Sequence, residues 1–342
     1  MNTAATEANT GPAVRIASPS APRVSGLKAS LTIVAIGALG LLVPVLVQSQ
    51  LTMTLLTQAV IYAILATAIG FMIRQNGLTS FGHAAFFGLA AYTMALNGKF
   101  DLMTSELSIV VAIAVPAALA FLAGLIIVRL PALAFSMLTL AVAQSFHELF
   151  LRWRELAGGD DGMPVRLPSS LFGLDISHFQ IPAQMFVICW IVLVLVVGGL
   201  WLLARSRFGV LTLAIRENEE RARYIGYETL IPRALIFALS AAVGALSGVL
   251  FVVYNAFITP GSLHWSLSGE ALIMAIIGGT QAIWGPALGA IIFFLLKDTA
   301  GDMTEHWPAI MGITLIVVTV LLPHGVSGLL VSWARKLRGI EK

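Results

Sequence analysis

The feature that most constrains this chain is a succession of apolar segments, most of them long enough to cross a lipid bilayer. They lie at about residues 31–47, 51–73, 83–97, 106–128, 132–151, 182–204, 234–257, 269–280, 284–296 and 308–332. A membrane-spanning helix needs roughly 20 apolar residues. Charged residues make up 11% of the chain, whereas soluble domains carry about 25%. The sequence therefore predicts an all-α polytopic integral membrane protein with about ten transmembrane helices, and it excludes a soluble enzyme.

The distribution of basic residues predicts the topology. Residues 1–28, the loop 205–233 and residues 335–342 hold three, six and four of the 20 Lys and Arg residues. Such residues concentrate on the cytoplasmic side of membrane proteins. We therefore expect a flexible cytoplasmic tail (1–28), a transmembrane domain (29–332) that includes the cytoplasmic loop, and a basic cytoplasmic tail (333–342). Ten crossings, six before the loop and four after it, place both termini in the cytoplasm.

Three of the apolar segments are short, and each borders a glycine-rich break in the chain. The breaks lie at residues 76–82 and 278–285. The glycines of the two breaks are similarly spaced: Gly77, Gly82 and Gly88 in the first, and Gly279, Gly285 and Gly289 in the second. Interrupted helices at corresponding places in two halves indicate a transport pathway, because unwound backbone inside a membrane must be buried in protein or line a cavity. The sequence thus predicts a weak two-half pseudo-repeat whose breaks flank a solute route.

The sequence contains no motif for catalysis, for a metal site or for nucleotide binding. HExxH and GxSxG are absent, and Gly98-Lys99 lacks the flanking residues of a phosphate-binding loop. The six histidines show no metal-ligand spacing. The single cysteine, Cys189, excludes an internal disulfide and a cysteine-based metal cluster. We expect a chain that is not an enzyme, has no catalytic residues, binds no metal, cofactor or nucleic acid, and needs a partner to supply energy.

Few titratable side chains fall inside the apolar segments, and we expect those few to lie near segment ends. They are Arg74, His147, Glu148, Glu270 and Lys297. Proton-coupled carriers usually place carboxylates near the middle of the membrane. This pattern weighs against a stand-alone secondary transporter or channel, which stays open as the alternative function.

The loop that follows the sixth apolar segment is the most informative polar part of the chain. Residues 209–226 are compatible with one helix, which two i,i+4 pairs would stabilise, Glu217 with Arg221 and Glu219 with Arg223. A terminal glycine, Gly226, is suited to cap it. Its apolar residues available for contacts include Leu213, Ile215 and Ile225. The segment is either a solvated helix beside the membrane or a docking helix for a cytosolic partner.

Four stretches of the chain resemble one known family. Residues 76–88 are similar to the N-G-x-x-S-x-G-H-A-A-F-F-G signature of the permeases of branched-chain amino acid ABC transporters, in particular the LivM-like branch. Residues 157–163 resemble its T-G-G-x-D-G loop, and residues 214–226 resemble its A-I-R-E-x-E-x-x-A-x-x-x-G coupling loop. Residues 260–289 resemble its G-G-x-G-x-x-x-G-P-x-x-G-A segment. Ala157 and Gln281 stand where the family usually has Thr and Gly.

The resemblance implies a heteromeric importer in the bacterial inner membrane. This chain would pair with a second homologous permease, two cytosolic ATP-binding subunits would dock on the coupling loops, and a periplasmic solute-binding protein would deliver the solute. The solute would be a branched-chain amino acid, with urea, amides or related small polar solutes as alternatives. Candidate pathway residues are Asn76, Gly77, Ser80, Gly82, His83, Gly278, Gly279 and Gln281. Candidate ATPase-coupling residues are Arg216, Glu217, Glu219 and Gly226, and candidate binding-protein contacts are Asp160 and Asp161.

Simpler structural roles are open for several of these residues. His83 could bond to backbone at a helix start instead of contacting the solute. Ser80, with its neighbour Thr79, could cap the same helix. Asp160 and Asp161, which lie between glycines, could simply form a turn. The GxxxG pairs Gly244/Gly248 and Gly285/Gly289 predict close contact between helices.

Overall fold

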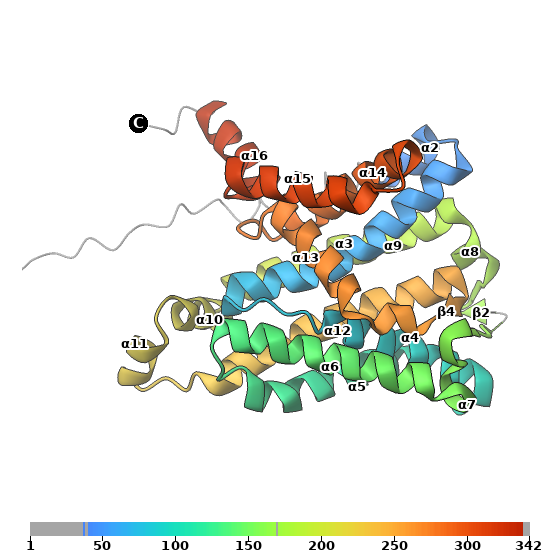
Figure 1. The fold of residues 1–342 in the computed structure, drawn as a ribbon, viewed down its shortest axis with the longest axis horizontal. Coiled ribbons are helices and arrows are strands. Elements are labelled where there is room, and N and C mark those ends of the chain that lie inside the picture. The colour runs from blue at the N-terminus through green and yellow to red at the C-terminus, as the bar shows by residue number, and fades with distance from the viewer. Residues whose placement is uncertain (1–36, 38–39, 169, 338–342) are drawn as a thin grey trace, which may run out of the picture.

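The computed structural model describes residues 37, 40–168 and 170–337, and in that part the chain is a bundle of helices that run side by side (Figure 1). The predicted tail 1–28, most of the predicted segment 31–47 and residues 338–342 lie outside the described residues. The longer helices are α3 (Gln50–Asn76), α4 (His83–Phe100), α5 (Ser105–Ile127), α6 (Ala132–Arg152), α9 (Pro182–Arg205), α12 (Leu230–Asn255), α13 (Trp265–Gly278), α14 (Gly285–Met303), α15 (Trp307–Leu321) and α16 (Gly325–Leu337). The predicted all-α membrane fold is confirmed.

The described helices do not confirm the predicted number of spans. Among the described residues, five helices are long and apolar enough to cross a membrane, namely α3, α5, α6, α9 and α12. A sixth span results if the bent pair α15 and α16 is taken as one. Helices do form over the predicted segments 83–97, 269–280 and 284–296, but α13 is short, and the last turns of α4 and α14 are polar. The predicted count of ten crossings is therefore not confirmed.

Helices α3 and α12 lie at the centre of the bundle. Most of their residues are buried, since α12 packs against α4 and α5 while α3 packs against α9, α13 and α14. The predicted close helix contacts are confirmed. A Cβ atom added to Gly248 would lie 2.1 Å from the carbonyl oxygen of Phe87, and one added to Gly289 would lie 1.9 Å from that of Met274.

The last predicted segment, 308–332, is interrupted. Helices α15 and α16 meet at an angle of 41° across a break that contains Pro323. Proline lacks a backbone N–H and disfavours helical backbone at the residue before it. Helix α16 then continues past 332 to Leu337, into the region predicted as a tail.

Short elements occupy the two ends of the bundle (Figure 1). At one end, which we call the α11 end, lie α10 (Arg207–Glu217) and α11 (Glu219–Tyr224). The opposite end, the α8 end, carries a short irregular region. Its elements are α7 (Arg154–Ala157), η1 (Gly159–Asp161), β1 (Met163–Pro164), β2 (Ser170–Leu171), β3 (Leu174–Asp175) and α8 (Ser177–Gln180). Two more short elements, β4 (Phe257–Ile258) and η2 (Pro260–Leu263), follow α12. Strands β1 and β4 pair antiparallel, as do β2 and β3. A further short helix, α2 (Val43–Leu46), precedes α3.

Candidate functional site

The first glycine-rich break unwinds the chain between α3 and α4. Helix α3 ends at Gly77, whose φ of +68° is in the left-handed region that glycine favours. Hydroxyl groups of α6 then form hydrogen bonds with the backbone and side chains of the unwound segment. Thr79 Oγ1 lies 2.7 Å from Ser136 Oγ, and the backbone N–H of Phe81 donates to Thr139 Oγ1 at 3.2 Å. The break is thus embedded in protein, as unwound backbone inside a membrane must be.

Helix α4 begins deep inside the bundle. Lys99, near its far end, donates to the carbonyl oxygen of Glu155 at the α8 end. From Ala84 to Phe100 the helix rises roughly 24 Å at 1.5 Å per residue. The prediction that Thr79 or Ser80 caps α4 is wrong, because Gly82 is the N-cap residue of α4. Ser80 Oγ accepts from the N–H of Gly82 at 3.1 Å. The N–H of Ala84 instead donates to Ser268 Oγ of α13, at 2.7 Å.

His83 joins three central helices. Its Nε2 lies 2.7 Å from Ser240 Oγ on α12, and Ser240 donates its own hydrogen to the carbonyl oxygen of Ala68 on α3, also at 2.7 Å. Because a serine has one hydrogen to give, His83 Nε2 must be the donor, which leaves Nδ1 as an unprotonated atom without a partner. The side chain is fully buried. His83 therefore bonds to a side chain rather than to backbone, and it reaches no exposed surface in this conformation.

The second break has the same layout as the first. Helix α13 ends before Gly279, whose φ is +90°, and α14 begins as many residues after it as α4 begins after Gly77. Here backbone packs directly on backbone. A Cβ on Gly278 would lie 1.9 Å from the carbonyl oxygen of Gly285, and one on Gly279 would lie 2.2 Å from that of His324. Close packing therefore accounts for both glycines.

Gln281 is an exposed residue of the second break. Its Nε2 lies 2.8 Å from Nδ1 of His324, in the connection before α16. The second break also packs on α3, the helix that leads into the first break, since a Cβ on Gly70 would lie 2.3 Å from Pro286 Cγ at the start of α14. The structure thus brings the two predicted breaks against the same central helix.

Two predicted pathway residues meet the predicted coupling segment. Asn76 Nδ2 donates to the carbonyl oxygen of Arg233 at 2.9 Å. The side chain of Arg216 passes over Gly77, where a Cβ would lie 3.2 Å from Arg216 Cγ, and its Nη1 donates to the carbonyl oxygen of Arg74 at 2.8 Å. Residues predicted as two separate groups therefore form one cluster at the α11 end.

The prediction of a single helix over 209–226 is wrong. Helix α10 ends at Glu217, and Asn218 has extended backbone with a φ of −158°. The side-chain oxygen of Asn218 accepts from the N–H of Arg221 at 2.8 Å, so Asn218 caps α11. Asparagine competes for backbone bonds in a helix interior and is a favoured N-cap. Gly226, with a φ of +90°, follows the end of α11 where a terminal glycine was predicted.

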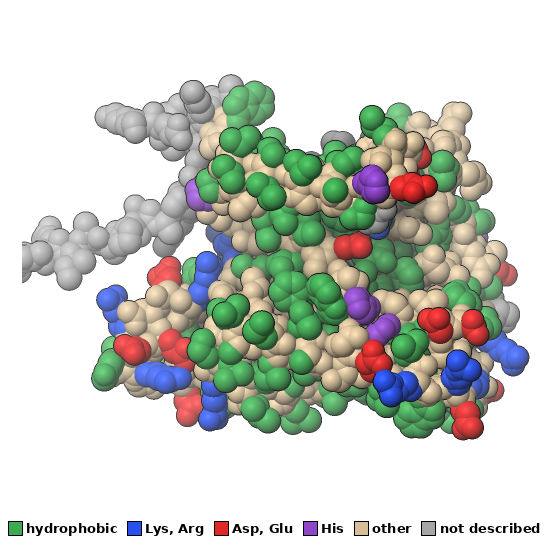
Figure 2. Space-filling model, in the orientation of Figure 1, with side chains coloured by type: hydrophobic (Ala, Val, Ile, Leu, Met, Phe, Trp, Pro, Cys, Tyr) green, Lys and Arg blue, Asp and Glu red, His purple; other side chains and the backbone are tan. Residues whose placement is uncertain are grey.

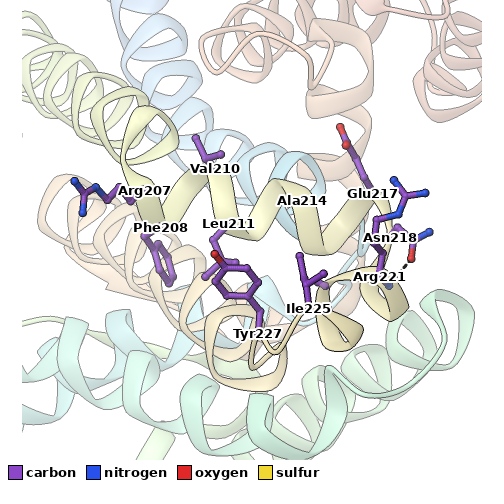
Figure 3. A pocket seen from close by; sticks show the side chains of 11 residues that line it. Arg207, Phe208, Val210, Leu211, Ala214, Glu217, Asn218, Arg221, Ile225 and Tyr227 are labelled. Atoms are coloured by element: carbon purple, nitrogen blue, oxygen red, sulfur yellow. Dashed lines mark hydrogen bonds between the residues drawn. The ribbon is translucent and has the colours of Figure 1, made fainter. Parts of the chain in front are cut away.

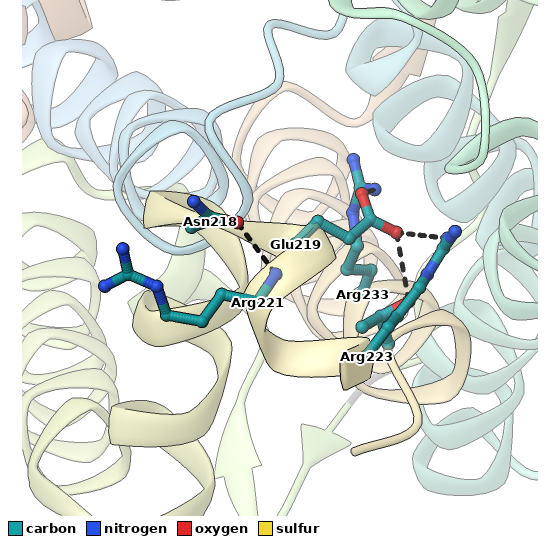
Figure 4. Close-up of polar contacts among 6 residues, drawn as sticks. Asn218, Glu219, Arg221, Arg223 and Arg233 are labelled. Atoms are coloured by element: carbon teal, nitrogen blue, oxygen red, sulfur yellow. Dashed lines mark hydrogen bonds and ion pairs between the residues drawn. The ribbon is translucent and has the colours of Figure 1, made fainter. Parts of the chain in front are cut away.

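Glu219 ties α11 to the start of α12. Its Oε1 accepts from Arg223 Nη2 at 2.5 Å and from Thr229 Oγ1 at 3.0 Å, while its Oε2 accepts from Arg233 Nη1 at 2.5 Å (Figure 4). We call this group, Glu219 with Arg223, Thr229 and Arg233, the Glu219 clamp. The predicted pair of Glu219 with Arg223 is confirmed. No ion pair joins Glu217 to Arg221 among the residues described.

A groove of about 600 Å³ runs between α10 and α11 (Figure 3). Its lining is Arg207, Phe208, Val210, Leu211, Ala214, Glu217, Asn218, Arg221, Ala222, Ile225 and Tyr227. In Figure 3, Leu211, Ile225 and Tyr227 lie in the middle, with Arg207 at one edge and Glu217 and Arg221 at the other. We call this the α10/α11 groove. Ile215, predicted to contact a partner, is instead buried within the chain.

Asp160 and Asp161 lie on the surface of the α8 end. They form the single turn η1 between glycines of positive φ: Gly158 at +78°, Gly159 at +68° and Gly162 at +71°. The predicted turn-forming role is confirmed, and their contact with a binding protein stays a prediction.

An ion pair that the sequence did not single out joins α13 to α14. Lys297 Nζ lies 3.5 Å from Glu270 Oε2. That these charges lie near span ends stays a prediction; within their helices both lie inside the ends, because both helices are longer than the apolar segments. Helix α13 begins at Trp265, where His264 Nδ1 accepts from the N–H of Ser266 at 3.3 Å, and α14 continues to Met303. Among the described residues, no group of three or more His, Cys, Asp or Glu could hold a metal ion.

Comparisons with known proteins agree on one family. The sequence profile of the family described as "Branched-chain amino acid transport system / permease component" matches residues 51–319. The chain is 26% identical to the high-affinity branched-chain amino acid transport system permease protein LivM of Escherichia coli K12, over 89% of this chain and 76% of that protein. It is 26% identical to the autoinducer 2 import system permease protein LsrC of Photorhabdus laumondii, over 73% of this chain and 74% of that protein. No solved structure matches the chain.

Proposed function

The chain belongs to the family of permease components of branched-chain amino acid transport systems, and from this membership we propose that it is a permease subunit of an ATP-driven amino-acid importer. In this proposal it forms the route through the bacterial inner membrane together with a second, homologous permease. Two cytosolic subunits hydrolyse ATP, and a periplasmic binding protein delivers the solute. The family match over most of the chain is the observation that carries the proposal.

The proposal fixes an orientation for the molecule. The α11 end holds six arginines within 205–233, and basic residues concentrate on the cytoplasmic side. The α11 end is therefore cytoplasmic, where the ATPase subunits are. The α8 end is then periplasmic, and the exposed turn with Asp160 and Asp161 is available there to the binding protein.

The α10/α11 groove is the proposed ATPase contact. Its middle is apolar and its rim carries Arg207, Glu217 and Arg221, a combination that suits a protein interface with a hydrophobic centre and a polar edge. Glu219 is already bound within the clamp, so Glu217 is the carboxylate of this segment that faces the partner.

Bonds at the α11 end can pass motion of this segment to the centre of the bundle. Thr212 of α10 donates to Gln75 of α3 at 3.0 Å, and both side chains are buried. Arg216 holds the end of α3, and the Glu219 clamp holds the start of α12. Helices α3 and α12 in turn hold His83 at the start of α4. A displacement of α10 and α11 by the ATPase would therefore reach the first break through direct contacts.

Charge reversal at Glu217 tests this function. The chain is produced with its partner subunits, and co-purification of the ATPase and solute uptake by reconstituted vesicles are measured. We expect Glu217→Arg to reduce ATPase co-purification, or uptake per ATP hydrolysed, at least fivefold, since a charged interface contact replaced by its opposite costs about 2 kcal/mol or more. Glu220→Arg is the matched control, because Glu220 is an exposed carboxylate of α11 that lies outside the groove.

A stand-alone secondary transporter or channel is the alternative, and the Glu270–Lys297 pair favours it, because charges within spans often carry coupling ions. The same vesicles separate the two. Uptake by the isolated chain without ATPase subunits or ATP would establish the alternative and reject the importer.

A further inference from the structure

The Glu270–Lys297 pair lies well inside the bundle. Ser268, two residues before Glu270, bonds to the N–H of Ala84 at the beginning of α4. That point is roughly 24 Å along α4 from its end at the α8 end, at 1.5 Å per residue. Since a bilayer's hydrocarbon core is about 30 Å thick, the pair lies at a depth where lipid chains would surround the molecule.

Both charged side chains are nevertheless partly exposed. The side chain of Glu270 is 33% exposed and that of Lys297 is 34% exposed. On the face shown in Figure 2, charged and histidine side chains lie in a shallow depression in the middle of a largely hydrophobic and uncharged surface. The same side of α13 presents Ser266 and Gly269 along with Ile273, each at least partly exposed. Ionised groups inside a membrane face water or protein and not lipid, so this face is turned toward water or toward the second permease of the proposed importer.

The distance between the two charged groups is also long for an ion pair. Charge-assisted N–H···O bonds are typically about 2.7–2.9 Å long, and this one is 3.5 Å. The helices that carry it do not depend on it for their packing, because the backbones of α13 and α14 already touch at Gly289 and Met274. An ion pair with these properties can open without separating the helices.

We infer that Glu270 and Lys297 form the recognition point for zwitterionic α-amino acids on the solute route, an inference that rests on the proposed function. The ammonium of the solute takes the place of Lys297 at Glu270, and its carboxylate takes the place of Glu270 at Lys297. One ion pair opens and two form, so no charge is left alone inside the membrane. Urea or an amide has no charges to replace the opened pair. The site therefore selects amino acids over such neutral solutes.

The test uses the whole transporter in vesicles with its binding protein, ATP and radiolabelled leucine. The variants are Glu270→Gln, Lys297→Gln and the double variant with both changes. Glu148→Gln is the matched control, because Glu148 forms a pair of similar length, 3.4 Å, with Arg152 within α6. Leucine uptake, the ATPase activity stimulated by the loaded binding protein, and assembly of the complex are measured together.

We expect each single variant and the double variant to lower leucine uptake per ATP at least tenfold, with stimulated ATPase activity within twofold of wild type. The loss of uptake should be the same for every neutral amino acid that the wild-type complex imports, because the pair binds the ammonium and carboxylate groups that all of them share. The control should keep at least half of the uptake.

Wild-type uptake in the double variant would overturn the inference and leave the pair as a structural contact. If a single variant fails to assemble, the double variant decides, since it leaves no unpaired charge. The wild-type arm tests the proposed function separately. A wild-type complex that imports urea or an amide but no amino acid refutes the proposed substrate, whereas normal leucine import with unaffected variants refutes only the recognition point.

Discussion

The molecule contains two ion-pair regions of opposite design. In the Glu219 clamp, one carboxylate binds two arginines at 2.5 Å each and a threonine, and the side chain of Arg233 is only 12% exposed. In the Glu270–Lys297 pair, the distance is 3.5 Å and both side chains are about one-third exposed. The clamp lies where α11 meets α12 at the α11 end, and the pair lies between α13 and α14 within the bundle.

The difference shows what each region can contribute. A short chain segment such as α11 has little buried surface of its own, so short bonds to α12 must hold it in place. Helices α13 and α14 have close backbone contact between residues 274–278 and 285–289, so their ion pair is not needed to hold them together. The clamp therefore suits transmission of force, and the pair suits exchange with a solute. Three changes to the molecule test this contrast.

The largest effect is expected where α13 and α14 are held by backbone contact. Gly289→Val would place a Cβ 1.9 Å from the carbonyl oxygen of Met274, which cannot move without displacing α13. We expect a loss of stability of about 3 kcal/mol or more, seen as the absence of a monodisperse complex on size-exclusion chromatography. Gly269→Ala is the control, since its Cβ would make an ordinary contact of 3.9 Å with Phe81. Normal assembly of the valine variant would show that this backbone contact does not hold the two helices together.

A smaller effect is expected at the clamp. Glu219→Ala leaves the largely buried Arg233 side chain without its carboxylate. Removing one partner of a buried pair costs about 3–5 kcal/mol, and the partial exposure of Glu219 reduces this to about 2 kcal/mol. The apparent melting temperature of the purified complex should fall accordingly, while Glu228→Ala, a change at an exposed neighbour, should leave it unchanged. An unchanged melting temperature in Glu219→Ala would mean that α11 is held by other contacts.

The sequence predicted the elements of both regions better than their contacts. Apolar runs located the longer described helices, because burial in lipid or protein demands such runs, and the glycines of both breaks marked where the helices end. The division at Asn218 was missed, since the i,i+4 charge pattern continues across it while a single side-chain cap interrupts the helix. Asn218 followed by acidic residues is a capping signal that could have revealed the division.

The partners of the candidate site residues could not be predicted from the sequence. Thr139 bonds to the first break, and Ser240 and Ser268 bond to the start of α4. Thr139 and Ser240 lie in apolar runs and Ser268 directly precedes one, where a hydroxyl has no periodic signature. The depth of Glu270 was missed because the helix begins before the apolar run does, at Trp265. The opposite charges of Glu270 and Lys297 on two adjacent short segments were the available signal for the ion pair. Whether two such residues meet across a break depends on how the helices pack, which the sequence does not give.

The smallest effect is expected for the stability contributed by the Glu270–Lys297 pair, and double-mutant cycles measure it directly. Melting temperatures of the complex are compared for the two single glutamine variants and the double variant at Glu270/Lys297, and for the corresponding variants at Glu219/Arg233. A loose pair that borders water should show a coupling free energy below about 1 kcal/mol, whereas the clamp should show about 2 kcal/mol, within the range known for neighbouring groups. The reason is hydration, because water weakens the attraction between two charges and also stabilises whichever charge remains after its partner is removed. A coupling at Glu270/Lys297 as large as that of the clamp would mean that the pair is dry and structural, and the contrast between the two regions would be lost.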